Sequence, residues 1–241
     1  MIEGGPAEAG ASSAGGSSSA SPSLASRLRS RTWLPAQGEA TATVLLRHGQ
    51  TTTSVQKRYA GRSDVPLTDT GVRQAVAAAR RLVPAGLSAI ISSPLQRAMR
   101  TAEWVAGVTG VPVVAEEDFR ETDFGAWEGL TFAEVRERWP AEMTAWLADP
   151  SVAPPGGESF AQVSERVTTA LHRVLASRAR QNVLIVSHVT PIKTLVAASL
   201  LAPPAALYRM HLDVAAVCEI DWYADGPAVL RSFNDTAHLS Q

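Results

Sequence analysis

Two histidines and two arginines occupy positions where strand-like segments end or a helix begins. Arg47 and His48 follow the apolar run TVLL, and His188 follows the run NVLIVS. Arg97 belongs to SSPLQR, which reads as a loop that leads into a helix. A guanidinium can donate two parallel hydrogen bonds to phosphate oxygens, and the free N–H groups of a helix N-terminus attract anions. These residue types therefore predict a binding site for a phosphate group.

The elements that hold these side chains are predicted to form an α/β fold. Strand-like runs such as TVLL and SAIIS alternate with helical patterns such as TDTGVRQAVAAARRLV. Such alternation is typical of a three-layer sandwich, in which a central, mostly parallel sheet has helices on both faces. Parallel strands bring their carboxyl ends to one edge of the sheet, so we expect the arginines and histidines to converge there.

Local signals predict where several elements begin and end. Thr68 is expected to cap the first long helix, and Ser93 before Pro94 is typical of a capped helix start. Apolar residues recur at helical spacing from about Ser159 to Ala176, which predicts a third long helix. The runs VAAVCEIDWYA and AVLRSFND, separated by Asp-Gly-Pro, predict a closing hairpin.

Composition limits the class of protein. The 241 residues include 22 basic and 23 acidic side chains, and the net charge of −1 gives no general reason to expect a nucleic acid or membrane partner. A single cysteine, Cys218, excludes an intramolecular disulfide and fits a reducing compartment. No bilayer-spanning run and no signal peptide are recognisable. We therefore expect a cytoplasmic protein.

The domain organisation follows from a change in composition near the start of the chain. Residues 1–40 are rich in glycine, serine and alanine, and we predict that they form a flexible tail or linker. A single folded domain is expected over residues 41–241. The sequence does not indicate an oligomeric state.

Six stretches resemble, in order, the motifs of the histidine phosphatase superfamily, the phosphoglycerate mutase-like enzymes. The resemblance covers roughly residues 41–241, and the stretches are LLRHGQT, SDVPLTDTG, SSPLQRAMRTAE, ETDFGAWEG, PPGGESF and VSHVTPIK. One Arg-His-Gly alone is a weak signal, whereas six motifs in the family's order are a strong one. The resemblance implies an α/β sandwich and a covalent phosphohistidine intermediate.

The resemblance also implies a role for each matching residue. These roles are nucleophile for His48, phosphate clamp for Arg47 and Arg97, second phosphate-binding histidine for His188, and proton donor for Glu121. A neutral imidazole that is held by its other nitrogen can attack phosphorus, and fixed cations can stabilise the charge that develops. We therefore expect neither a metal nor another cofactor.

The assignment of the proton donor leaves alternatives open. Four other acids lie close to Glu121 in the sequence, namely Glu116, Glu117, Asp118 and Asp123. Glu128, in the Trp-Glu-Gly turn, is expected to be structural. The tryptophans are scattered and are interpreted as core or rim residues.

Two positions depart from the pattern that the resemblance implies. Ser54 stands where many members carry an asparagine that binds phosphate, and Ala60 stands where a glutamine is often found. A serine hydroxyl can donate to an oxyanion, so Ser54 stays among the expected phosphate-binding residues, with rearranged contacts.

The expected activity is that of an acid phosphatase-type phosphomonoesterase acting on small phosphorylated metabolites. Mutases of this family carry a long insertion before the Gly-Glu-Ser motif, but here only residues 130–155 intervene, and a smaller lid leaves room for water. The alternatives are a phosphoglycerate-type mutase and a non-catalytic, phosphate-binding regulatory module.

The resemblance is strongest to the α-ribazole phosphatase-like branch, which makes α-ribazole 5′-phosphate a candidate substrate. That branch includes the phosphatase half of actinobacterial proteins in which a ribonuclease H domain comes first. We therefore expect that an upstream ribonuclease H domain is absent from this chain, while the phosphatase domain itself binds no nucleic acid.

Overall fold

The computed structural model of the protein describes Met1 and residues 38–240. The first strand in the described residues is β1 (Thr41–Arg47). Most of the predicted flexible tail, residues 2–37, lies outside the described residues. None of the helices in the described part of the chain is both long and apolar enough to cross a bilayer.

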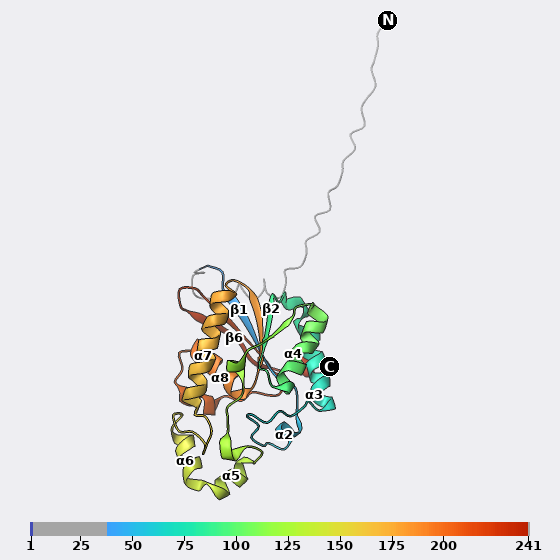
Figure 1. The fold of residues 1–241 in the computed structure, drawn as a ribbon. Helices are drawn as coiled ribbons and strands as arrows, with labels where there is room; N and C mark the ends of the chain where they lie inside the picture. The colour runs from blue at the N-terminus through green and yellow to red at the C-terminus, as the bar shows by residue number, and fades with distance from the viewer. Residues whose placement is uncertain (2–37, 241) are drawn as a thin grey trace.

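A six-stranded mixed sheet forms the centre of the fold (Figure 1). The strand order is β3 (Val113–Ala115), β2 (Ala89–Ser92), β4 (Asn182–Ser187), β1, β5 (Val217–Trp222) and β6 (Ala228–Asp235). The first four of these strands pair in parallel, whereas β5 is antiparallel to both β1 and β6. The sheet is therefore mostly parallel, and the predicted closing hairpin is confirmed.

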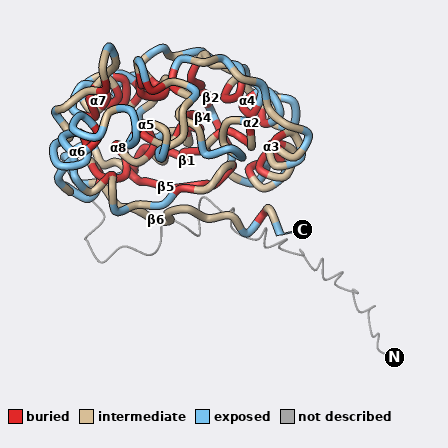
Figure 2. Tube along the Cα trace, turned by 90° about the horizontal axis from the view of Figure 1, so that it is seen from below, coloured by how far each residue is buried: buried red, intermediate tan, exposed pale blue. Residues whose placement is uncertain are grey.

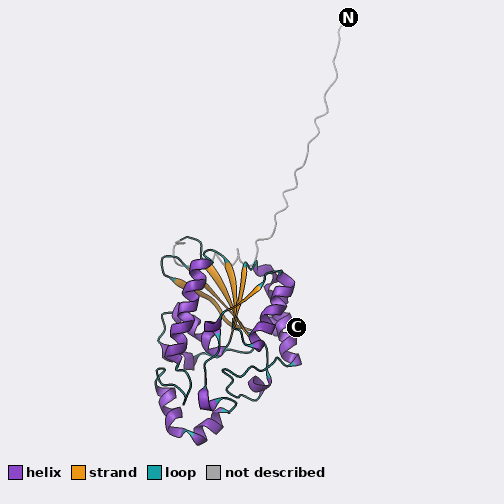
Figure 3. Cartoon of the chain, viewed as in Figure 1, coloured by secondary structure: helices purple, strands orange, loops and turns teal. Residues whose placement is uncertain are grey.

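Helices cover both faces of this sheet (Figure 3). The helices α3 (Asp69–Leu82) and α4 (Gln96–Thr109) share an apolar core with Leu46. The helices α7 (Phe160–Ser177) and α8 (Val189–Ser199) share the other core with Leu45. Neighbouring residues of a strand point to opposite faces, so β1 contributes to both cores. Buried segments occupy the middle of the molecule between the helices (Figure 2), which confirms the three-layer sandwich.

Two of the three predicted helix starts are confirmed, and one is wrong. The side chain of Thr68 caps α3 by accepting from the N–H of Gly71, and Ser159 caps α7. Helix α4 begins at Gln96 without a side-chain cap, so Ser93 does not have its predicted role. The Ser93 hydroxyl instead forms a hydrogen bond with a buried histidine, His188, at 2.7 Å.

Residues 123–158, which we call the lid segment, lie with the short helix α2 (Thr52–Val55) at one end of the sheet (Figure 1). The lid segment contains α5 (Phe132–Arg138) and α6 (Pro140–Ala148). Its two ends are joined by a hydrogen bond, in which the N–H of Glu158 donates to the carbonyl of Asp123 at 2.8 Å. Its apolar side chains form a third core, which includes Trp127, Met143 and Trp146.

Short 3₁₀ helices complete the described part of the chain. Their bounds are Val83–Ala85, Glu117–Phe119, Gly125–Trp127, Pro204–Arg209 and Ala237–Leu239. The first follows α3 directly, and the fourth follows α8 and packs against it.

Candidate active site

The carboxyl ends of β1 and β4 bring the two predicted histidines together. The strands are adjacent and parallel, with Arg47 paired to Ser187, so the residues that follow each strand are neighbours. The rings of His48 and His188 have centroids 5.1 Å apart and planes tilted by 57°. Both side chains are buried. The convergence expected from the sequence therefore holds for this pair.

The imidazole of His48 is held in one orientation by the backbone. Its Nδ1 lies 2.7 Å from the carbonyl oxygen of Gly49, and because a carbonyl only accepts, Nδ1 carries the hydrogen. The lone pair of the neutral ring is then on Nε2. Burial, followed by the positive charges of Arg97 and Arg47, holds the pKa of His48 well below its usual value. His48 is therefore a neutral, oriented base at neutral pH.

Packing requires a glycine at position 49, in the Arg-His-Gly motif. A Cβ on Gly49 would lie 2.4 Å from the carbonyl oxygen of Gly71, at the start of α3. No side chain fits between these two backbones. The close approach fixes the loop that supplies the hydrogen-bond acceptor for His48.

The two arginines come from different elements and are anchored by carbonyl groups. Arg47 donates from Nη1 to the carbonyl of Leu212 at 2.6 Å. Arg97 is buried and donates to the carbonyls of Ser63 at 2.7 Å and Ala60 at 2.9 Å. Burial lowers the pKa of Arg47 to about 10, so this guanidinium is still a cation at neutral pH. Both arginines face the same pocket.

The loop that anchors Arg97 is itself held by Glu128. One carboxylate oxygen accepts from the N–H groups of Gly61 at 2.7 Å and Arg62 at 3.0 Å, and the other accepts from the Ser63 hydroxyl at 2.6 Å. Glu128 thus has a structural role, as expected. It also acts on the site indirectly, because it fixes the loop whose carbonyls orient Arg97.

His188 is positioned by a serine rather than by the backbone. Its Nε2 is 2.7 Å from Oγ of Ser93, whereas Nδ1 is buried and has no partner among the described residues. Burial, followed by the charge of Arg97 and the neighbouring His48, holds the pKa of His188 well below its usual value. If Ser93 donates to Nε2, the ring presents Nδ1–H as a free donor.

Glu121 is a nearly buried carboxyl group that is fixed by the start of α8. It accepts from the backbone N–H groups of Thr122 at 2.8 Å, Val189 at 3.0 Å and Thr190 at 3.2 Å. A helix N-terminus stabilises a negative charge through its free N–H groups and its dipole. On α7, Arg166 donates to the backbone carbonyl of Glu121 at 3.1 Å and thereby fixes the chain at this point.

The four rival acids lie elsewhere. Glu121 lines the pocket, whereas none of the rivals does. Glu116 and Asp118 form ion pairs with Arg173, and Glu117 and Asp123 form ion pairs with other arginines. The geometry therefore favours Glu121 over its rivals as the acid that faces a bound ligand.

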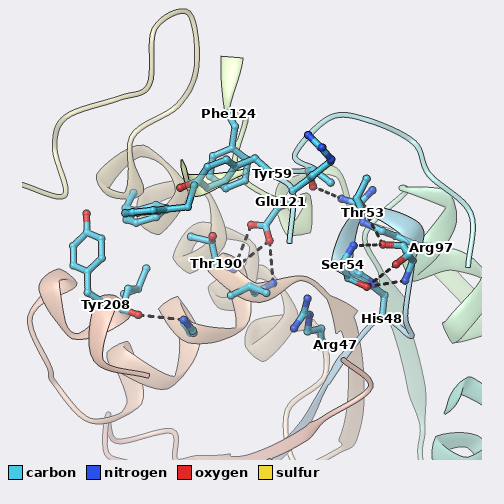
Figure 4. Close-up of a pocket in the computed structure, with 18 of the residues that line it drawn as sticks. Arg47, His48, Thr53, Ser54, Tyr59, Arg97, Glu121, Phe124, Thr190 and Tyr208 are labelled. Atoms are coloured by element: carbon cyan, nitrogen blue, oxygen red, sulfur yellow. Dashed lines mark hydrogen bonds between the residues drawn. The ribbon is translucent and has the colours of Figure 1, made fainter. Parts of the chain in front are cut away.

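Arg47, His48, Arg97 and Glu121 line a pocket of about 400 Å³ (Figure 4), whereas His188 is fully buried and is not among the residues that line it. Ser54 also lines it, but its hydroxyl donates to the carbonyl of Thr51 at 2.8 Å as part of the cap of α2. Ala60, the other departure, lines the pocket and supplies a carbonyl to Arg97.

Sequence reasoning missed the outer part of the pocket. Six aromatic residues line it, namely Tyr59, Phe124, Phe132, Trp146, Phe160 and Tyr208. The interpretation of the tryptophans as core or rim is therefore incomplete, because Trp146 belongs both to the core of the lid segment and to the pocket wall. Lys193 of α8 also lines the pocket. Its position one turn after His188-Val189-Thr190 was the signal that could have revealed it.

Two curated relatives match most of this chain. The bifunctional protein Rv2228c of Mycobacterium tuberculosis is 48% identical over 208 residues, which make up 86% of this chain and 57% of that protein. The chain thus spans little more than half the length of this relative. GpmB of Cronobacter sakazakii, named a probable phosphoglycerate mutase, is 35% identical over 203 residues, or 81% of this chain and 93% of GpmB.

Solved structures share the same fold. The mycobacterial glucosyl-3-phosphoglycerate phosphatase Rv2419c has a TM-score of 0.76 and 33% identity, over 82% of this chain and all of that one (100%). A candidate α-ribazole-5′-P phosphatase of Escherichia coli has a TM-score of 0.75 and 29% identity, over 81% of this chain and 97% of that one. Residues 43–236 match the family description "Histidine phosphatase superfamily (branch 1)". The chain therefore belongs to this superfamily of phosphatases and mutases.

Proposed function

We propose that this chain is a phosphomonoester hydrolase that works through a phosphohistidine on His48. The observation that carries the proposal is the 2.7 Å hydrogen bond from Nδ1 of His48 to Gly49, because it leaves a neutral Nε2 as the nucleophile. A phosphoryl group held by Arg47 and Arg97 would lie beside this nitrogen. The lowered pKa of His48 keeps the ring unprotonated while two cations stand next to it.

In the first half-reaction, Nε2 of His48 forms a bond to phosphorus while the ester P–O bond breaks. The leaving oxygen takes a proton from Glu121 and departs as an alcohol. Arg47, Arg97 and His188 stabilise the charge on the other three phosphoryl oxygens. A phosphoryl oxygen would also supply an acceptor for Nδ1 of His188, which has no partner among the described residues.

In the second half-reaction, water attacks phosphorus and the P–N bond to His48 breaks. Glu121, now a carboxylate, takes the proton from the water, and inorganic phosphate leaves. The backbone N–H groups around Glu121 suit the carboxylate form that this step needs. The enzyme returns to its starting state with a neutral His48.

Ser54 remains a proposed phosphate ligand. Its side chain lines the pocket, and the proposal requires its hydroxyl to turn from the Thr51 carbonyl to a phosphoryl oxygen. A serine contributes one neutral donor, which is a smaller stabilisation than either guanidinium provides.

The relatives suggest two kinds of leaving group. One is the aromatic nucleoside of α-ribazole 5′-phosphate, and the aromatic residues of the outer pocket would suit a planar ring. The other is a hydroxy acid, as in glucosyl-3-phosphoglycerate. We favour hydrolysis over mutase activity because the lid segment contains only two short α-helices, α5 and α6, and leaves space in the pocket for water.

The experiment that tests the proposal is the trapping of the phosphoenzyme. The protein would be mixed with a ³²P-labelled phosphomonoester and quenched in alkali, in which phosphohistidine survives. We expect label on the wild-type protein and none on His48→Ala. The matched control is His172→Ala, since His172 is an exposed residue on α7 and lies outside the pocket.

The same reactions separate hydrolase from mutase. With 3-phosphoglycerate as substrate, a hydrolase releases inorganic phosphate, whereas a mutase produces 2-phosphoglycerate faster than phosphate. Wild-type turnover without any alkali-stable label would exclude the phosphohistidine mechanism. Equal labelling of wild type and His48→Ala would assign the nucleophile to another residue.

A further inference from the structure

The pocket has two chemically different parts. The inner part carries the guanidiniums of Arg47 and Arg97 beside His48, and this is where the phosphoryl group is proposed to bind. The outer part is walled by aromatic residues of the lid segment and of the 3₁₀ helix Pro204–Arg209. A leaving group must occupy this outer part, so the polar groups found there determine the substrate specificity.

Lys193 is a cation that lines this pocket, and its Nζ donates to the carbonyl of Leu207 on the 3₁₀ helix Pro204–Arg209. It lies four residues after Val189 and three after Thr190 on α8, so its side chain is on the same face of the helix as the side chains of these two residues, whose backbone N–H groups hold Glu121. Burial lowers the pKa of Lys193. The charge of Glu121 raises this pKa, and the charge of Arg47 lowers it.

The ammonium of Lys193 has unused hydrogen-bonding capacity. Its single hydrogen bond within the described residues goes from Nζ to the carbonyl of Leu207, at 3.3 Å. None of the ion pairs formed within residues 38–240 includes Lys193. An ammonium has three N–H donors, so two of them are available to a ligand.

The other cation of the outer pocket is different. Arg58 forms an ion pair with Glu134 at 2.9 Å, and the same nitrogen donates to the carbonyl of Gly129 at 2.8 Å. Its charge is thus neutralised by the protein. The charge of Glu121 raises the pKa of Lys193, but its carboxylate is occupied by three backbone N–H groups and forms no ion pair with Lys193.

A partly buried ammonium that forms no ion pair is costly to keep in a folded protein. Burial lowers the pKa of Lys193, which is the expected sign of this cost. The cost is offset when an anion binds. The phosphoryl group already has two guanidiniums, so a single further ammonium matches a single further negative charge on the substrate.

We propose that Lys193 binds a carboxylate in the leaving group, so that phosphorylated hydroxy acids are the preferred substrates. This inference rests on the proposed function, because it presumes that the phosphoryl group sits at His48. It ranks hydroxy-acid phosphates above α-ribazole 5′-phosphate, which has no carboxylate. Lys193 is thus a specificity-determining residue rather than a participant in phosphoryl transfer.

The test compares two substrates that differ in one group. They are 3-phosphoglycerate, which has a carboxylate, and glycerol 1-phosphate, which has a hydroxymethyl group at that place. We expect wild-type kcat/KM to favour 3-phosphoglycerate by on the order of 10- to 100-fold, as a charge-assisted hydrogen bond would give. In Lys193→Met this ratio should fall to near one, mainly through a higher KM for 3-phosphoglycerate, and Lys193→Arg should restore part of it.

The chain offers a matched control. Lys57 is an exposed lysine outside the pocket, and Lys57→Met should leave the substrate ratio as in wild type. If Lys193 instead only tunes Glu121, then Lys193→Met will shift the pH profile for both substrates equally and leave the ratio unchanged, which overturns the inference.

Failure of this inference can be told apart from failure of the proposed function. Hydrolysis of glycerol 1-phosphate with alkali-stable labelling of His48, together with a wild-type ratio near one, would overturn the role of Lys193 alone. Absence of labelling and of phosphate release from both substrates would overturn the proposed function itself.

Discussion

Glu128 and Arg97 hold the same short loop from two sides. The carboxylate of Glu128 accepts from the N–H groups and hydroxyl of residues 61–63, while the guanidinium of Arg97 donates to carbonyls of residues 60–63. The loop therefore transmits the position of one side chain to the other. Removal of Glu128 should disturb the phosphate site although Glu128 does not line it.

For Glu128→Ala we expect kcat/KM to fall on the order of 10- to 100-fold, because a charged hydrogen-bonding anchor is lost. The inhibition constant of inorganic phosphate should rise with it, since Arg97 is less well oriented, and Glu128→Gln should lie in between. The matched control is Glu103→Ala, which removes only an exposed ion pair on α4. An unchanged phosphate inhibition constant in Glu128→Ala would contradict the link to Arg97.

A second prediction concerns Ser93, which was expected to cap α4 and is instead hydrogen-bonded to His188. In Ser93→Ala, His188 loses the partner of its Nε2, and kcat should fall about 10-fold, the equivalent of one hydrogen bond. Ser92→Ala is the matched control, because Ser92 is also buried but donates only to a backbone carbonyl. Equal kcat values for the two variants would show that Ser93 does not position His188.

Stability should depend on pH through the two central histidines. The pKa values of His48 and His188 are well below 6.5 in the folded protein, so below pH 6.5 the unfolded chain takes up protons that the folded protein does not. The free energy of unfolding should therefore decrease as pH falls, by up to about 1.4 kcal/mol per pH unit for each histidine. Urea unfolding at pH 7.5, 6.5 and 5.5 measures this.

The double variant His48→Asn/His188→Gln should show a flatter pH dependence over the same range. His238 keeps a smaller slope of the same sign, because burial lowers its pKa too. A slope in the double variant as steep as that of wild type would mean that the two histidines titrate alike in the folded and unfolded states.

Arg166 should matter for both stability and catalysis. It forms an ion pair with Glu158 at 2.7 Å and donates to the carbonyls of Asp118, Arg120 and Glu121. We expect Arg166→Met to lower the free energy of unfolding by about 3 kcal/mol, since it leaves a partly buried acid and three carbonyls without their donor. It should also lower kcat, because Glu121 is no longer fixed.

The comparison for this prediction is Arg173→Met on the same helix. Arg173 is half exposed, and its ion pairs with Glu116 and Asp118 are at the surface, so the expected loss is below about 1 kcal/mol. Thermal or urea unfolding and steady-state kinetics of both variants decide the matter. Equal losses in the two variants would argue against the role given to Arg166.

The sequence predicted what depends on local patterns and on sheet topology. Apolar runs that end in Arg47-His48 and in His188 had to meet, because parallel neighbouring strands end at the same edge. The third long helix was predicted within one residue at each end, since Ser159 is a good N-cap and the apolar stripe is regular. The start of α4 was misplaced, because Ser93 is recruited by a histidine that is 95 residues away in the sequence.

The outer pocket could not be predicted for a related reason. Lys193, Trp146 and Tyr208 lie on three different elements, and each has an ordinary structural interpretation in its own segment. Only packing of the lid segment against α8 and the following 3₁₀ helix makes them neighbours. A contact of this kind leaves no periodic signal in the sequence.

The hydrogen bond that joins the two ends of the lid segment has an evolutionary consequence. The chain leaves the sandwich at Asp123 and returns beside it at Glu158. The lid segment is therefore an insertion whose exchange would not alter the spacing of the strands. Phe124, Phe132 and Trp146 belong to the lid segment, whereas Arg47, His48, Arg97 and His188 do not. Homologous lids that keep Glu128, which holds the Arg97 loop, could thus be grafted onto this scaffold, and lineages can diversify in the molecules that they accept while the phosphoryl chemistry is inherited.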